Sequence, residues 1–151
     1  MKKLVSTLKL EKKEWLTYRK KGIGGSDAGA VCGLNPYRTA IQVYQDKISE
    51  EIEELDNEAM RQGREFEDYV AKRFMEATGK KVRRANAIFY HEKYPFMLAD
   101  VDRMVVGENA GLECKTASPY MADKWENGKI PLSYQIQCYH YMTVCGADAW
   151  Y

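Results

Sequence analysis

The clearest pattern of apolar and polar positions runs through residues 57–78. At about 100° per residue, one narrow stripe of this segment collects apolar and small residues together with one acid: Gly63, Glu67, Val70 and Phe74, with Phe66 beside it. Gly79 follows directly. The pattern predicts one long helix that packs on the protein along this stripe and ends at the glycine.

Glu67 lies on the apolar side of that predicted helix. A carboxylate in such a position is costly unless it is paired with a cation or binds a metal ion. An ion pair with Arg64 or Arg73 would be a purely structural explanation, but both arginines lie off the stripe. We therefore favour a functional role for Glu67.

A second pattern, between residues 96 and 116, is typical of a β-hairpin. Two segments rich in β-branched and apolar residues flank a turn at residues 107–109. Because successive side chains of a strand point to opposite faces, Glu113 and Lys115 share one face. Asp102, on the partner strand, can face Glu113 across the hairpin.

The remaining segments predict shorter elements. Helices are expected over residues 11–21, over 119–125 and from Pro131 to Cys145. Two more are expected to end near Val31, with Gly25 or Ser26 as the cap, and near Ile48, with Thr39 as the cap. Strands are expected within 80–96 and 147–151. The last helix has an inner face made of Tyr134, Cys138, Tyr141, Met142 and Cys145. Gln135 borders this face, and Gln137 and His140 lie further round. The order of elements predicts an α/β fold with a mixed β-sheet flanked by helices.

Composition narrows the class of protein. The 151 residues are 45% hydrophobic and 30% charged, which suits a single globular domain over residues 1–151. Without an apolar run of roughly 18 residues or a signal-peptide core, the sequence predicts a cytoplasmic protein with no membrane partner. A net charge of +1 leaves nucleic-acid binding to local basic patches, at residues 12–13, 19–21 and 80–84. The cysteines stand singly, so we expect buried thiols rather than disulfides or metal clusters: Cys32, Cys114, Cys138 and Cys145.

The candidate chemistry lies in the predicted hairpin. Two carboxylates that converge, Asp102 and Glu113, repel each other unless a cation lies between them, and hard oxygen ligands suit Mg²⁺ or Mn²⁺. Lys115 could then help to deprotonate a metal-bound water or neutralise charge that develops at phosphorus. This would be metal-assisted hydrolysis of a phosphodiester. An ordinary surface hairpin with an exposed Glu–Lys pair explains the same motif about equally well.

A glycine-rich segment, GIGGSDAG at residues 22–29, follows Arg19 closely. Such a loop, leading into the N-terminus of a helix, can cradle an anion. It can also be a tight turn that lets two helices pack closely, and the loop by itself favours this second explanation.

Five short motifs lie in order along nearly the whole chain. They are R-x(2)-G-I-G-G-S-D-A from Arg19, G-R-E-F-E from Gly63, A-D-V-D…L-E-C-K over 99–115, Y-Q-I-Q-C-Y from Tyr134 and A-W-Y at 149–151. Together they resemble the YqaJ/lambda-exonuclease family of phage recombination nucleases, members of the PD-(D/E)xK superfamily. The resemblance implies a restriction-endonuclease-like core in one nuclease domain. Family members usually continue with a further strand and a C-terminal helix, which this domain is expected to lack.

The resemblance also implies a metal site. Asp102 and Glu113 would be the metal-binding carboxylates, the backbone carbonyl of Cys114 a further ligand, and Lys115 the catalytic lysine. Asp100 is a nearby but weaker choice for the aspartate. The sequence departs from the family here, because it reads Asp-Val-Asp rather than Pro-Asp and has Arg103 where glycine is usual.

Four further residues take roles from the same resemblance. Glu67 would lie near the metal and order its ligands or water. Gln135 would contact the lysine or the scissile phosphate. Arg19 and Ser26 would hold the 5′-terminal phosphate of a DNA duplex.

The expected function is hydrolysis of DNA with Mg²⁺, for which Mn²⁺ can substitute. The resemblance favours a 5′-to-3′ exonuclease on linear double-stranded DNA in phage-type recombination, with a single-strand annealing protein as partner and a homotrimer as the family's oligomer. An endonuclease with the same metal site is an alternative, and so is a catalytically reduced relative that binds DNA or protein. The intact Asp102, Glu113 and Lys115 favour an enzyme.

Overall fold

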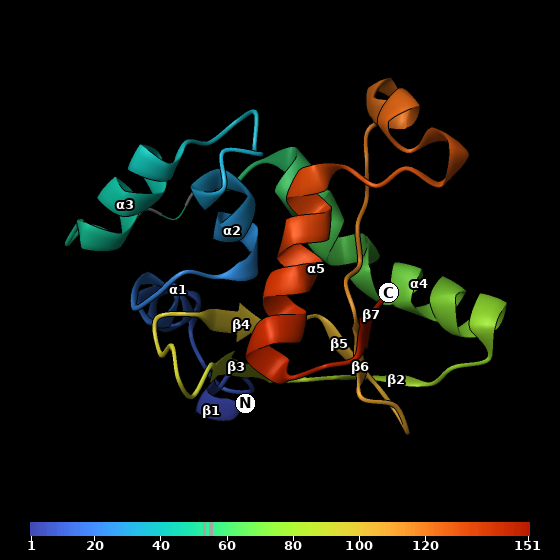
Figure 1. Ribbon diagram of the computed structural model, residues 1–151, viewed down its shortest axis with the longest axis horizontal. Coiled ribbons are helices and arrows are strands. Elements are labelled where there is room, and N and C mark those ends of the chain that lie inside the picture. The colour runs from blue at the N-terminus through green and yellow to red at the C-terminus, as the bar shows by residue number, and fades with distance from the viewer. Residues whose placement is uncertain (53, 55) are drawn as a thin grey trace.

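The longest helix, α4, spans Glu58–Thr78 in the computed structural model, which describes residues 1–52, 54 and 56–151 (Figure 1). Asn57 caps it, because its side-chain oxygen accepts a hydrogen bond of 2.9 Å from the Met60 amide, one of the amides that a helix start leaves free. The predicted stripe is half-buried and adjoins the buried Ala71, whereas Phe66 is exposed. The long helix is therefore confirmed, with its stripe facing the protein.

The predicted short helices are also present: α1 (Lys12–Lys20), α2 (Gly25–Val31), α3 (Ala40–Ile48), α5 (Leu132–Cys145) and 3₁₀ turns at Pro119–Lys124 and Glu126–Gly128. Thr39 caps α3 as predicted, and its hydroxyl accepts from the Gln42 amide at 3.2 Å. The cap of α2 is Gly24 rather than Gly25 or Ser26.

Within the described residues the strands form two sheets. One has the order β1-β3-β4 and is antiparallel, with β1 at Lys2–Ser6, β3 at Ala87–Tyr90 and β4 at Leu98–Asp100. The other has the order β2-β5-β6-β7, with β2 at Val82–Arg84, β5 at Arg103–Val105, β6 at Ala110–Leu112 and β7 at Ala149–Trp150. Since β6 and β7 are parallel, this sheet is mixed. The α/β fold with a mixed sheet is confirmed, but β1 was missed because only two of its five residues, Leu4 and Val5, are apolar.

The predicted hairpin over residues 96–116 is interrupted at Val101 and Asp102. Before this point β4 pairs with β3, and after it β5 pairs with β2 and β6, so the chain passes from one sheet to the other. Alternation could not reveal the break, because the segments on both sides of it alternate. The break places Asp102 at the junction of the two sheets.

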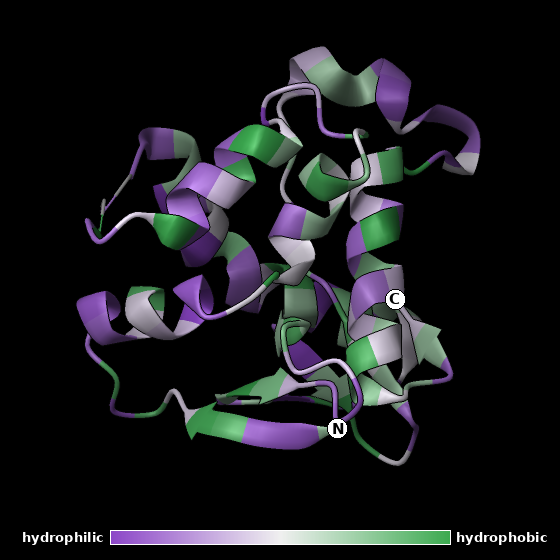
Figure 2. Cartoon of the chain, turned by 60° about the vertical axis from the view of Figure 1, so that its left-hand side comes forward, coloured by the Kyte–Doolittle hydropathy of each residue, from purple (hydrophilic) through white to green (hydrophobic). Residues whose placement is uncertain are grey.

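The helix α5 crosses the strands (Figure 1, red) and buries a face that differs from the predicted one. Its buried residues are Gln137, His140, Tyr141, Val144 and Cys145. The prediction that Gln137 and His140 lie further round is therefore wrong. His140 satisfies its buried ring by a hydrogen bond of 2.8 Å between Nε2 and the Leu98 carbonyl. In Figure 2 the helices carry both hydrophobic and hydrophilic bands, as expected of elements that cover a core on one side.

The glycine-rich segment allows α2 to pack directly on α5. A Cβ added to Gly25 would lie 2.4 Å from Cε1 of Tyr141, closer than any side-chain carbon can approach. The segment therefore does allow close helix packing, and α2 has no freedom to accept a larger residue at its first position.

A similar contact joins β6 to β7. A Cβ on Gly111 would lie 2.4 Å from the Trp150 ring. The Tyr151 amide donates to the Gly111 carbonyl at 3.0 Å, and the Glu113 amide donates to the Tyr151 carbonyl at 3.0 Å. The backbone of Glu113 is thus held by Tyr151, the residue that follows β7.

Asp27 joins α2 to α3 through a buried ion pair. Its side chain is 2% exposed and lies 2.8 Å from Nη1 of Arg38 and 2.7 Å from Nζ of Lys47. Burial by itself would raise the pKa of Asp27, but the hydrogen bond and charge of Lys47 outweigh it and lower the pKa.

Asp27→Asn is expected to destabilise the protein by roughly 3 kcal/mol, because removing one member of a buried pair leaves the other charges unpaired. Chemical denaturation would measure the loss. Asp46→Asn is the matched control, because Asp46 also binds Arg38 but is 44% exposed, so it should cost less than about 1 kcal/mol. Equal, small losses for both variants would contradict this account of Asp27.

The four cysteines are free thiols. Cys145 is buried as expected and Cys114 and Cys138 are half-buried, but Cys32 at the end of α2 is exposed, which corrects the prediction for that residue. None of the helices in the described part of the chain has both the length and the apolar character needed to cross a membrane.

Candidate active site

The register of β5 and β6 brings Asp102 and Glu113 together. Arg103 pairs with Leu112 and Met104 with Gly111, so the next step of the same register sets Asp102 opposite Glu113. A hydrogen bond of 2.7 Å from the Cys114 amide to Oδ2 of Asp102 fixes the aspartate at this point. The juxtaposition predicted from the hairpin is therefore present, although the ladder itself ends one residue earlier.

The Glu113 side chain is buried, with 8% of its surface exposed. Its Oε1 accepts hydrogen bonds of 2.6 Å from Nζ of Lys115 and 2.6 Å from Nε2 of Gln137. Its Oε2 is buried and finds no hydrogen-bond partner among the described residues. Buried carboxylate oxygens are normally satisfied, so Oε2 is the position at which a cation would complete the site.

The electrostatics also favour a cation at this place. Burial, followed by the charge of Glu113, raises the pKa of Asp102 to about 7. Burial likewise raises the pKa of Glu113, although Lys115 opposes the change. For Lys115, burial lowers the pKa, but the Glu113 carboxylate outweighs burial and the pKa is raised. One lysine thus does not compensate two buried carboxylates, and the residues present fit a divalent cation.

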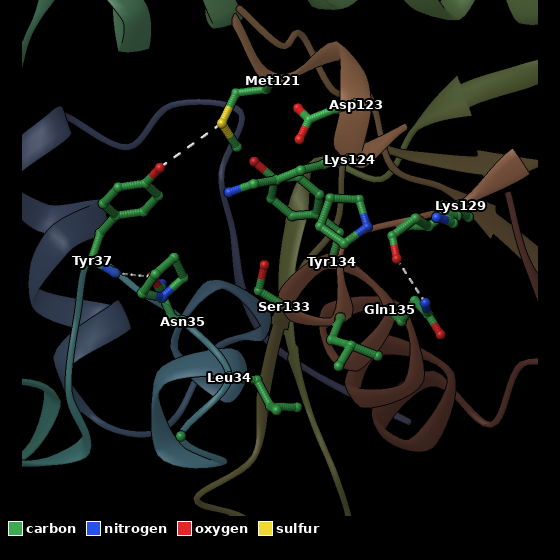
Figure 3. Close-up of a pocket in the computed structure, with 15 residues that line it drawn as sticks. Leu34, Asn35, Tyr37, Met121, Asp123, Lys124, Lys129, Ser133, Tyr134 and Gln135 are labelled. Carbon is green, nitrogen blue, oxygen red and sulfur yellow. Dashed lines mark hydrogen bonds between the residues drawn. The ribbon is translucent and has the colours of Figure 1, made fainter. Parts of the chain in front are cut away.

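The glutamine that reaches the site is Gln137, not Gln135. Gln137 is buried and donates to both Glu113 and the Tyr141 hydroxyl, the latter at 3.1 Å. The Gln135 amide instead donates to the Ile130 carbonyl at 2.7 Å and lines a separate pocket (Figure 3). The Q-x-Q motif offered both residues, and Gln137 could have been chosen because it lies four residues before the buried Tyr141, on the same helix face.

Glu67 has a cationic partner that the sequence did not indicate. Its carboxylate binds Arg103, the departure from the family pattern, while Arg64 pairs with Asp56 and Arg73 with Glu76. Both arginines offered as structural partners are therefore excluded. In the described part of the chain no three Asp, Glu, His or Cys side chains converge to hold a metal, so Glu67 does not join Asp102 and Glu113 as a direct third member.

Arg19 and Ser26 lie together in the structure. Nη2 of Arg19 donates to the Ser26 hydroxyl at 2.8 Å, and the guanidinium lies 4.5 Å from the centre of the Trp15 ring. Both residues line a cavity of about 180 Å³ that Asp102 also lines. Asp100 borders the same cavity and accepts a hydrogen bond of 2.6 Å from the Trp15 indole.

The geometry can be compared with proteins of known structure. The fold is that of an alkaline exonuclease: LHK-Exo from Laribacter hongkongensis matches with a TM-score of 0.72 and 21% identity, over 89% of this chain and 69% of that one. The structure of LHK-Exo in complex with dAMP matches with a TM-score of 0.73.

Sequence comparison gives the family. Residues 14–148 match the YqaJ-like viral recombinase domain. The Bacillus subtilis (strain 168) protein YqaJ, described as uncharacterized, is 47% identical over 146 residues, which are 96% of this chain. The chain belongs to the YqaJ-like viral recombinase family, and it spans 46% of the length of that relative.

Proposed function

We propose that the protein is a metal-dependent deoxyribonuclease. The observation that carries this proposal is the buried Oε2 of Glu113, which lacks a partner in the described structure and belongs to a carboxylate pair beside Lys115. A surface hairpin with an exposed Glu–Lys pair would need neither the burial nor the second carboxylate. The family and the fold of LHK-Exo, described as an alkaline exonuclease, support a nuclease.

Asp102 and Glu113 would hold the ion, Mg²⁺ or Mn²⁺, with the backbone carbonyl of Cys114 between Glu113 and Lys115 as a further ligand. When bound, the ion supplies a Lewis acid and an acidified water. Gln137 fixes the orientation of Glu113 through Oε1. Lys115 holds a positive charge beside the carboxylate, where it can assist deprotonation of water and offset charge that develops on the scissile phosphate.

The proposed substrate is the 5′ end of linear double-stranded DNA. A cavity that contains both Arg19 and Asp102 could hold a terminal phosphate close to the metal ligands, with the guanidinium and the Ser26 hydroxyl as donors. Degradation would then run from 5′ to 3′ and leave a 3′ single strand for an annealing protein. The complex of LHK-Exo with dAMP, a mononucleotide, agrees with an enzyme of this class.

Arg19→Ala is expected to remove most of the preference for 5′-phosphorylated over 5′-hydroxyl duplex ends. The charge-assisted hydrogen bonds that it forms with a phosphate are worth about 1.5–3 kcal/mol, which corresponds to roughly a 10- to 100-fold preference. Rates on two otherwise identical linear duplexes would measure it. Lys21→Ala, which removes an exposed charge from the same basic segment, should leave the preference intact.

An endonuclease with the same metal site is the second candidate, and Asp100 favours it. Its carboxylate borders the cavity and would oppose a terminal phosphate, which an endonuclease does not need to bind. Wild-type protein that cuts closed circular DNA as fast as linear DNA would establish this alternative. Absence of any cleavage with Mg²⁺ or Mn²⁺ would instead favour a relative that only binds DNA.

A further inference from the structure

Arg103 is a buried arginine that contacts the backbone of Asp102, one of the two acids of the candidate metal site. Its side chain is 5% exposed, an unusual position for a residue that is almost always at the surface. Nη1 donates to the Glu67 carboxylate and, at 2.8 Å, to the backbone carbonyl of Asp102, while Nη2 binds Asp68. One guanidinium thus joins α4 to the residue that carries the metal-binding carboxylate.

We propose that Arg103 is a positioning residue for the divalent cation, because it holds Glu67 in the place from which this carboxylate orders a metal-bound water. This inference rests on the proposed function, because it assigns the arginine a task only if a metal binds at Asp102 and Glu113. Carboxylates around metal sites are commonly oriented by such outer partners, whose loss weakens metal binding.

A purely structural task does not account for these contacts. Arg84 on β2 already ties α4 to the sheet through two hydrogen bonds to Asp68, at 2.7 and 2.8 Å, and it does so at the surface. Burying a second arginine for the same purpose would add desolvation cost without need. The contacts that only Arg103 makes are those to Glu67 and to the Asp102 carbonyl.

Charge explains why a cation is needed behind Glu67. Burial is the main cause of the raised pKa of Asp102 and of Glu113, and the nearby Glu67 carboxylate adds to the rise in both. The guanidinium offsets this third negative charge, so Glu67 can remain near the pair before a metal arrives. Its planar fork also binds the neighbouring acids of α4 in one fixed orientation, which a lysine cannot do.

The test is the affinity of the complete chain for Mn²⁺, measured by calorimetry in the absence of DNA, together with the rise in melting temperature on adding the ion. Arg103→Met and Arg103→Lys are expected to weaken binding by about 10- to 100-fold. Arg84→Met is the matched control, because it removes an arginine from the same acidic cluster without touching Glu67, and it should bind like wild type. Wild-type or tighter affinity in both Arg103 variants would overturn the inference.

A double variant distinguishes an effect of Arg103 through Glu67 from a general loss of structure. In Glu67→Gln/Arg103→Met no charge is left unpaired between α4 and β5, and Mn²⁺ should bind no more weakly than to Glu67→Gln alone, since the arginine acts mainly through that glutamate. A further large loss in the double variant would show a general structural role and overturn the inference. Wild-type protein that binds no Mn²⁺ would overturn the proposed function as well, whereas normal wild-type binding with unaffected variants would overturn this inference alone.

Discussion

Glu113→Gln and Asp102→Asn are each expected to reduce Mg²⁺-dependent DNA cleavage by at least about 10³-fold, since a bound metal supplies several kcal/mol of transition-state stabilisation. Each amide fills the space of the acid it replaces but does not carry the charge that would bind the ion. Cleavage of linear duplex with Mg²⁺, compared with EDTA, measures the effect, and the ion should no longer raise the melting temperature. Wild-type turnover in either variant would show that the metal lies elsewhere.

Asp102→Asn should behave in the opposite way without metal. Because the pKa of Asp102 is about 7 in the folded protein, against an ordinary value of 3.8, the fold binds the proton more tightly than the unfolded chain. This residue therefore makes metal-free stability fall as pH rises from about 4 to 7. Asp102→Asn should lose that slope and melt above wild type at pH 8 in EDTA. A variant that is less stable at every pH would indicate a misfolded site instead of an absent ligand.

Lys115→Met is the second large effect, and it separates chemistry from metal binding. The rate should fall by roughly 10²- to 10⁴-fold, the usual contribution of an acid–base group. Affinity for Mn²⁺ should be kept or increased, because Glu113 loses a competing cation that lies 2.6 Å away. The lysine nitrogen also lies 5.2 Å from the centre of the Tyr134 ring, so the variant loses this cation–π contact as well.

Single-turnover rates at saturating metal, set beside calorimetric affinities, distinguish the two effects. Lys124→Met is a matched control from a nearby 3₁₀ turn, since Lys124 lines the separate pocket of Figure 3. If the Lys115 variant lost Mn²⁺ affinity together with the cleavage rate, the lysine would be needed to form the metal site and not for the chemical step.

The sequence predicts best where the physics is local. The starts of α4 and α3 follow from cap residues whose side chains bond an amide three residues further on. The facing of Asp102 and Glu113 follows from the short distance between two strands joined by one turn. Cys114 supplies a backbone amide to that pair, a detail that no side-chain pattern could indicate.

The sequence predicts worst where a partner is distant in the chain. Arg103 lies 36 residues from Glu67, and only the packing of α4 on the second sheet brings them together. The choice between Gln135 and Gln137 depended on which face of α5 meets the strands, and the apolar count suggested a face rotated away from the true one. The change of sheet at Val101 was missed for a similar reason. An alternating pattern shows which face each side chain takes, but it does not show which strands pair with one another.

The contact between Gly111 and Trp150 has a consequence for the interpretation of variants. Gly111 carries no functional group, yet any side chain there must displace the Trp150 indole and with it β7. The residue after β7, Tyr151, accepts the hydrogen bond of the Glu113 amide, so this displacement would reach Glu113. Substitutions at this glycine would thus mimic active-site lesions in a genetic screen, although they lie outside the chemistry. A map of loss-of-function positions would extend the proposed catalytic centre too far along β6, and a measurement of folding would be needed to exclude these positions from it.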